Sequence, residues 1–191
     1  MPRLSMVRRR FTDALLRMSE SRDLRDVRLA DVIDASGMSR QTFYNHFASY
    51  EDLFDYVASR PLLEGECALF TPEHALDCLR RMRAHEAFFR QLPAHEFGVR
   101  YHGLLDAWLV RLAVAEFVAP SATLSERQRR GACVTLYVMG TTQVVYGWLA
   151  DGMQADVETL TGAICSMIPG FMHATRAVPH PNGLDYPHVT P

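Results

Sequence analysis

The chain has 191 residues, 48% of them hydrophobic and 22% charged, which suits one folded domain with a small appendage and excludes a disordered or collagen-like protein. The formal charge is −2, and all 20 basic residues are arginine. Residues 1–50 carry nine arginines and six acidic residues, whereas residues 51–191 carry eleven and sixteen. The pI near 6.4 therefore hides a basic N-terminal part on an acidic remainder.

The four cysteines, Cys67, Cys78, Cys133 and Cys165, are far apart in the sequence and form no Cys-x-x-Cys pair. Each has apolar neighbours, so we expect buried free thiols in a reducing cytoplasm. The arginine-rich first ten residues are not followed by an apolar run, so they do not resemble a secretory signal. The expected location is therefore the cytoplasm.

Between Pro2 and Pro61 the chain contains no proline, and apolar residues recur three or four positions apart, the spacing of one face of an α-helix. Glycine in Ser36-Gly37 favours a left-handed helix end, Ser39 is a candidate cap, and Pro61 weakens or interrupts the last helix of this part. The predicted helices cover about residues 4–21, an eight-residue segment with Leu29, Val32 and Ile33, residues 40–46 and residues 51–67.

The remainder begins at Thr71-Pro72, where a cap residue is followed by proline in the first turn of a helix. A Ser-x-x-Gln capping box at Ser125 and Gln128 opens a long helix that ends before Gly152. The helices predicted after the one at Thr71-Pro72 cover about residues 84–92, 96–117, 125–151 and 156–174. The tail from Ala177 holds four prolines and is expected to be irregular.

Residues 131–150 contain no charged residue and have the length of a membrane span, which leaves a transmembrane helix as an alternative. Four polar side chains interrupt this apolar run: Thr135, Thr141, Thr142 and Gln143. The favoured interpretation is a helix packed by its own domain on one side and by another subunit on the other. Gly140 and Gly147 suit the close approach of a neighbouring helix.

Two short helices joined by Ser36-Gly37-Met38 have the arrangement of a DNA-reading helix-turn-helix. The second, from Ser39 to His46, would be about 12 Å long, close to the width of the major groove of B-DNA. Its polar side chains suit two tasks. Arg40 can bond guanine, and Gln41 and Asn45 can bond adenine. The side chains able to reach phosphate oxygens are Thr42, Tyr44 and His46. The alternative is an ordinary solvated helix face.

Residues 11–53 resemble the DNA-binding domain of TetR/AcrR-type transcriptional regulators, and the specific part is the run Gly-Met-Ser-Arg-Gln-Thr-Phe-Tyr-Asn-His-Phe at 37–47. The resemblance implies an all-α fold of about nine helices, with an N-terminal three-helix helix-turn-helix domain and a helical-bundle C-terminal domain. It also implies a two-fold homodimer through the last two long helices, a third helix in the major groove, and an effector or partner bound by the C-terminal domain.

The resemblance assigns roles position by position. It implies phosphate contacts from Thr42, Tyr44 and His46, base contacts from Arg40, Gln41 and Asn45, and core positions for Phe43, Phe47 and Leu53, with Ser39 and Tyr50 completing the expected DNA-binding set. Two residues depart from the family pattern, because Arg28 replaces a capping threonine and Tyr50 replaces a lysine that contacts the DNA backbone. Arg8, Arg9 and Arg10 are candidates to compensate for that lysine, with a solvated face as the alternative.

The C-terminal domain resembles the subgroup related to dihydroxyacetone-kinase regulators at Tyr137 to Gly152, where a Trp-Leu pair closes the first dimer helix. Aromatic residues with a few polar tips suit an effector pocket between helices, although a position in the core or at the dimer interface is the favoured interpretation for any one of them. The pocket candidates are Phe88, Phe89, Tyr101, His102, Trp108, Tyr137 and Tyr146.

No pattern in the sequence favours catalysis, a cofactor or a metal site. The chain lacks a glycine-rich phosphate loop, a GxSxG motif and an HExxH motif, and His95 and His102 alone are a weak metal signal. We therefore expect a dimeric regulator, acting as a repressor, that binds a pseudo-palindromic operator of double-stranded DNA and responds to a small effector or partner. The alternative is a co-regulator of the same fold that acts through a protein partner with weak or no DNA binding.

The expected organisation has three parts. Residues 1–50 form the DNA-binding domain, to which the helix at about 51–67 links an effector-binding and dimerisation domain at 68–176, and residues 177–191 are the irregular tail.

Overall fold

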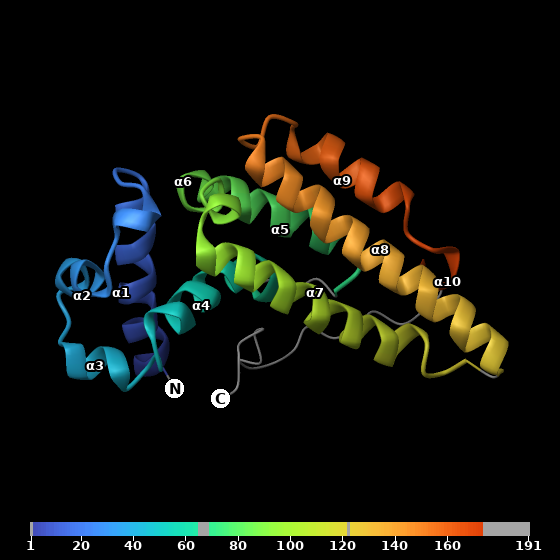
Figure 1. Cartoon of the computed structure of the whole chain (residues 1–191), viewed down its shortest axis with the longest axis horizontal. Coiled ribbons are helices and arrows are strands. Elements are labelled where there is room, and N and C mark those ends of the chain that lie inside the picture. Colours follow the sequence, from blue (N-terminus) through green and yellow to red (C-terminus); the bar gives the residue numbers. More distant parts are fainter. Residues whose placement is uncertain (1, 65–68, 122, 174–191) are drawn as a thin grey trace.

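A computed structural model describes residues 2–64, 69–121 and 123–173, and in these ranges the chain forms helices and loops without a strand. The predicted all-α fold is confirmed. Three helices gather at one end of an elongated molecule (Figure 1): α1 (Pro2–Ser19), α2 (Leu29–Ser36) and α3 (Arg40–Tyr44). From there α4 (Tyr50–Leu63) leads into the remaining helices.

The larger part is a bundle in which α7 and α8 run side by side over most of their length, while α5 packs against α4 and α9 (Figure 1). Its helices are α5 (Pro72–Ala84), α6 (Glu86–Phe89), α7 (Glu96–Phe117), α8 (Leu124–Ala150), α9 (Val157–Ser166) and α10 (Gly170–His173). Two short 3-10 helices, η1 (Leu24–Asp26) and η2 (Leu92–Ala94), complete the described elements. The sequence analysis predicted neither of these two.

Side-chain caps explain where the long helices begin. Thr71 caps α5 as predicted, since its hydroxyl accepts the N–H of His74. The predicted start of α8 at Ser125 is wrong, because Thr123 accepts the N–H of Glu126 and begins the helix earlier. The predicted end is correct, and Gly152 follows with a left-handed φ of +82°.

Three further predicted helices differ from the structure. The single helix at 84–92 is wrong: His85 leaves the helical conformation after α5, and Pro93, which has no N–H, lies in η2. The final helix at 156–174 is also wrong, because α9 ends at Ser166 and Pro169 separates it from α10. Pro61 lies inside α4 rather than interrupting it.

Buried aromatic side chains join the N-terminal helices to the bundle in one continuous core. Phe11 of α1 packs edge-on against Phe43 of α3, with ring centroids 5.2 Å apart. Phe54 of α4 packs against Phe88 of α6 at the same separation. Phe54 and Val57 of α4 belong to the same core as these residues, so α4 packs with both parts of the molecule.

The described cysteines, Cys78, Cys133 and Cys165, are free thiols, as predicted. Only Cys78 is buried, so the expectation of burial is wrong for the other two, which are partly exposed. Cys67, the last residues of the predicted 51–67 helix and the tail from Ala177 lie outside the described residues.

Within the described ranges, no helix combines the length and apolar character that crossing a bilayer requires. Residues 131–150 form most of α8.

Candidate nucleic-acid interface and internal cavity

The turn between α2 and α3 is shaped by glycine and serine. Gly37 takes a left-handed φ of +66° and donates its N–H to the carbonyl of Asp34, which ends α2. Two residues later Ser39 begins α3: its Oγ accepts the N–H of Thr42 at 3.0 Å and lies 2.8 Å from the Thr42 hydroxyl. The predicted helix-turn-helix geometry is therefore present, although α3 ends at Tyr44 rather than at residue 46.

One side of α3 is fixed in the core and the opposite side faces outward. Phe43 is fully buried against Phe11. Four outward side chains, which we call the recognition face, are Arg40, Gln41, Tyr44 and Asn45. The Gln41 side-chain amide donates to Asn45 Oδ1 at 3.1 Å, so these two side chains orient each other. Among the described residues, no acidic side chain forms an ion pair with Arg40.

Other residues of the expected DNA-binding set flank this face. Ser39 is exposed, whereas Thr42 and His46 are half-buried. The backbone carbonyl of His46 accepts a hydrogen bond from Arg8 Nη2 at 3.1 Å. This bond fixes the end of the turn that follows α3.

The structure contradicts a phosphate contact from Tyr50 in this conformation. Its hydroxyl is buried and has no hydrogen-bond partner within the described ranges, and its ring packs edge-on against Phe97, 5.8 Å away. Burial, together with the charge of Asp31, raises the pKa of this hydroxyl well above its usual value. The side chain that replaces the family lysine thus belongs to the contact between α4 and α7.

The three N-terminal arginines have different surroundings. The Arg8 guanidinium lies 5.3 Å from the ring centres of both Phe47 and Tyr56, so it is part of the packing. Arg9 pairs with Asp13 in α1. Arg10 is exposed and its Nη1 lies 3.8 Å from Met38 Sδ, next to the turn that precedes α3. Of the three, Arg10 is the one placed beside the candidate interface with a solvent-accessible charge.

Arg28, the other departure from the family pattern, precedes α2. A guanidinium has no acceptor and cannot cap a helix as threonine does. Instead, the carboxylate of Asp31 accepts the backbone N–H of Arg28 at 3.0 Å, which stabilises the start of α2 from inside the helix.

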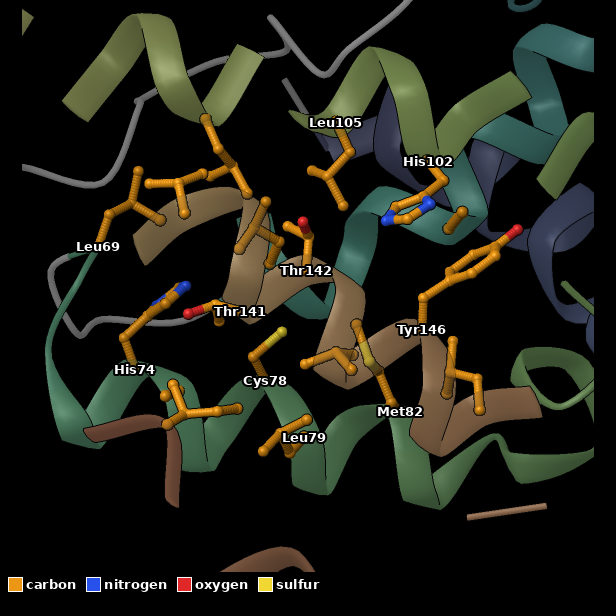
Figure 2. Close-up of a pocket in the computed structure, with 18 of the residues that line it drawn as sticks. Leu69, His74, Cys78, Leu79, Met82, His102, Leu105, Thr141, Thr142 and Tyr146 are labelled. Carbon is orange, nitrogen blue, oxygen red and sulfur yellow. The ribbon is translucent and has the colours of Figure 1, made fainter. Parts of the chain in front are cut away.

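A cavity of about 150 Å³ lies between α4, α5, α7 and α8 (Figure 2). Five of the predicted pocket residues line it: Phe89, Tyr101, His102, Tyr137 and Tyr146. The other two do not, which corrects their assignment. Phe88 packs against Phe54 in the main core, and Trp108 belongs to a second buried cluster formed with α8.

Sequence reasoning missed the polar contacts that join α4 to α7. Arg100 Nη2 contacts both carboxylate oxygens of Asp55 at 2.6 and 2.7 Å, and the hydroxyls of Ser59 and Tyr101 lie 2.9 Å apart. Asp55 is 2% exposed, and burial raises its pKa to about 6 although Arg100 lowers it. No local sequence signal distinguishes Asp55 from a surface acid, because its partner is 45 residues away.

Gln91 forms a second link between the two parts of the molecule. Its Oε1 accepts the N–H of Leu24 at 2.7 Å, and its Nε2 donates to the carbonyl of Ser19 at 3.2 Å. One side chain from the bundle therefore holds the loop between α1 and η1.

The two histidines considered as metal ligands have separate packing roles. His95 stacks on Phe54 and its Nδ1 accepts the N–H of Phe97, whereas His102 stacks on Tyr146. In the part of the chain that the structure describes, no group of three or more His, Cys, Asp or Glu side chains is arranged to hold a metal ion.

Comparisons with known proteins bear on both parts of the chain. Residues 11–57 match the family described as "Bacterial regulatory proteins, tetR family". Among solved structures, the fold is similar to a protein named "Dihydroxyacetone kinase operon activator DhaS", with a TM-score of 0.64 over 88% of this chain and 96% of that one. The two sequences are 12% identical, so the likeness is one of fold. No curated protein matches the chain. The family match confirms the resemblance predicted for residues 11–53, and the likeness of fold agrees with the resemblance predicted for the C-terminal domain.

Proposed function

We infer that this chain, a transcription regulator with a TetR-type domain at its N-terminus, acts as a homodimeric repressor on a pseudo-palindromic operator and responds to a small effector or partner. In this proposal, residues 1–50 bind DNA, α4 is the link, and residues 68–176 bind the effector and form the dimer. The observation that carries it is the outward recognition face of α3 in a domain that matches a family of bacterial regulators.

DNA recognition would use the recognition face directly. Arg40 can donate two hydrogen bonds to guanine, and Gln41 and Asn45 can exchange their mutual bond for an adenine edge. Ser39, Thr42, Tyr44 and His46 would contact phosphates. Arg10 takes the place of the missing lysine charge in this proposal, since it is exposed beside the turn that leads into α3.

An uncharged surface on α8 supports the proposed dimer. Leu136 is 74% exposed although it is large and apolar, and Met167, which follows α9, is 53% exposed. Small or apolar residues follow Leu136 along the same exposed side of α8: Met139, Gly140, Val144 and Gly147. Added methyl groups at Gly140 and Gly147 would meet no other atoms, so nothing within the described chain fills this side. Such a surface suits a second copy of the chain.

The position of the cavity supports effector control through α4. Ala58 and Leu62 of α4 line the cavity, and Ser49 at the other end of α4 follows the turn after α3. A ligand that prefers one position of α4 would favour one spacing of the two recognition helices in a dimer, and its differential affinity would set the size of the response.

Selection of bound sequences from a pool of random DNA duplexes tests the proposal. We expect a pseudo-palindrome whose half-sites lie about 10 base pairs apart or a multiple of that, because a two-fold dimer places its recognition helices in major grooves on one side of the duplex. A reporter gene carrying the selected site then measures whether the chain represses. Recovery of asymmetric sites, or reporter activation, would contradict the dimeric repressor.

The burial of Tyr50 favours a second candidate, a co-regulator that acts through a protein partner with weak or no DNA binding, because one family contact to the DNA backbone is missing. The same selection separates the two functions. A pool in which nothing is enriched, together with a stoichiometric partner in a pull-down, would support the co-regulator and overturn the operator-binding protein.

A further inference from the structure

The cavity has an aromatic end at which two rings lie face to face. The His102 imidazole stacks on Tyr146 with centroids 4.0 Å apart and planes 8° from parallel, and both rings border the cavity (Figure 2). Tyr146 already donates its hydroxyl to the carbonyl of Leu92, and Thr142 donates to that of Met139. These two hydroxyl hydrogens are therefore engaged within the protein.

One nitrogen at this end of the cavity, His102 Nε2, has no such engagement. His102 Nε2 and Asp106 Oδ1 are buried, lie 3.8 Å apart, and make no hydrogen bond within the described ranges. Both lie on α7, but only His102, like Leu105 and Leu109, lines the cavity. Leaving such an atom unsatisfied costs free energy, so a ligand group that bonds His102 Nε2 gains what the empty protein lacks.

The rest of the lining restricts the ligand by charge and size. The lining contains no aspartate, glutamate or arginine, so an anion or cation would lose its hydration without an ion partner. A polyol would bury several hydroxyls against side chains that are mostly apolar. A cavity of about 150 Å³ is comparable to apolar cavities that admit one benzene molecule.

We propose that the cavity binds an uncharged molecule with a single ring and one hydroxyl, of which phenol is the simplest example. The hydroxyl forms a hydrogen bond with His102 Nε2, while the ring fills the apolar space near Leu105. This inference rests on the proposed effector response for its regulatory meaning only, because the binding itself requires no DNA.

Calorimetric titration of the full chain without DNA tests the ligand class with four probes: phenol, toluene, benzoate and glycerol. Toluene has the shape of phenol without the hydroxyl, benzoate adds a charge, and glycerol is a polyol. We expect phenol to bind roughly tenfold more tightly than toluene, the effect of one hydrogen bond to a buried polar group. Benzoate and glycerol are expected not to bind. Tighter binding of either, or equal binding of phenol and toluene, would overturn the proposal.

Three variants locate the site. Leu105→Phe is expected to weaken phenol binding at least about tenfold by filling the cavity, whereas Leu104→Phe, on the same helix but outside the lining, leaves it unchanged. His102→Phe keeps a ring on Tyr146 but removes the nitrogen, so toluene and phenol should then bind equally. Circular dichroism and thermal melting confirm that each variant is folded. Phenol affinity unchanged in Leu105→Phe, or a retained preference for phenol in His102→Phe, would contradict the site.

The two proposals fail in distinguishable ways. Phenol binding by a chain that selects no DNA supports the ligand class and contradicts the operator-binding regulator. Selective DNA binding by a chain that binds none of the ring probes overturns the ligand class and leaves the regulator supported.

Discussion

Arg40 provides an unpaired charge on the recognition face, because among the described residues it makes no ion pair. Arg40→Ala is expected to cost about 1–3 kcal/mol of binding free energy at one base position and to relax specificity there, since a guanidinium fork reads guanine in two bonds. Fluorescence anisotropy with the selected duplex and its single-base variants measures both effects. Arg25→Ala is the matched control, because Arg25 is already paired with Asp23.

Tyr44 is expected to behave differently, because its proposed contact is a phosphate. Its side chain is 49% exposed beside Arg40 on α3. Tyr44→Phe should weaken all duplexes by a similar factor, since it removes a hydroxyl that carries no base information. Sequence-dependent loss in this variant, or uniform loss in Arg40→Ala, would contradict the assigned roles.

Asp55 gives the stability of the molecule a specific pH dependence. Burial raises its folded-state pKa from 3.8 to about 6, so the folded protein holds this proton more tightly than the unfolded chain. The resulting stabilisation is fully present below the unfolded pKa of 3.8 and is lost as pH rises through about 6. Between roughly pH 7.5 and pH 4, the wild type should gain on the order of 2 kcal/mol relative to Asp55→Asn.

Urea unfolding of both proteins across this pH range provides the measurement. The difference between the two free energies of unfolding cancels the groups that titrate in both proteins. A difference that stays constant, or that falls with decreasing pH, would show that Asp55 remains ionised in the folded state. The Arg100 contact would then outweigh the effect of burial.

At the residue scale, the sequence predicts what local chemistry determines. The cap at Ser39 and the inward side of Phe43 follow from helix spacing and capping rules, and both are present. The orientation of Tyr50 was not predictable in the same way, because it depends on Phe97, which lies on α7. The role of Arg8 similarly depends on Tyr56, a residue of α4.

At the scale of elements, one glycine sets the distance between η2 and α7. A Cβ built on Gly98 would lie 2.1 Å from the Leu92 carbonyl oxygen, which Tyr146 also bonds. Gly98→Ala should therefore destabilise the protein by about 1–3 kcal/mol or more, because backbone must move. Gly103→Ala on the same helix meets no atom, so it should be neutral or stabilise by up to about 1 kcal/mol.

Thermal and urea unfolding of the two variants measure this contrast. Equal stability of Gly98→Ala and Gly103→Ala would show that η2 can shift at little cost. A second readout is phenol titration, because Leu92 also lines the cavity. Gly98→Ala should weaken phenol binding, whereas Gly103→Ala should not.

Helices with a regular apolar period and clear ends were predictable, as the agreement for α2 and α7 shows. The connection between α5 and α7 was not, because its short helices α6 and η2 carry too few residues for a periodic pattern. Their shape depends on distant partners. Gln91, for example, is held by backbone groups of Ser19 and Leu24. The sequence predicted the cavity only as a set of buried aromatic residues. It could not distinguish those that line the cavity from those that pack in the core, because both kinds are buried.

At the scale of the whole molecule, the proposed signal path consists of packed contacts. The cavity touches α4 at Ala58 and Leu62, and α4 is tied to α7 by Asp55 and Arg100. Gln91 independently holds the N-terminal helices to the bundle. The hydrogen bonds of Gln91 remain in place when a ligand moves α4. We therefore expect the N-terminal helices to rotate about Gln91 rather than to detach from the bundle.

The dimer is the step on which symmetric DNA reading depends, and Leu136 on the uncharged side of α8 tests it. Leu136→Arg would bury two unpaired charges, one from each subunit, in the proposed two-fold interface. Dimerisation should weaken at least about 100-fold, because one such buried charge costs about 3 kcal/mol or more. Val99→Arg is the matched control, since Val99 is a 58% exposed apolar residue of α7, outside this surface.

Sedimentation equilibrium over a range of concentrations measures the dimer dissociation constant of both variants. Titration with the selected duplex then measures how a change in that constant affects DNA binding. A monomeric Leu136→Arg chain should bind each half-site separately and with lower affinity, because the second contact is no longer held at a high effective concentration. The Val99→Arg chain should remain dimeric and bind as the wild type does. If Leu136→Arg dimerises normally, the uncharged side of α8 is not the interface, and the two recognition helices must be paired through another surface.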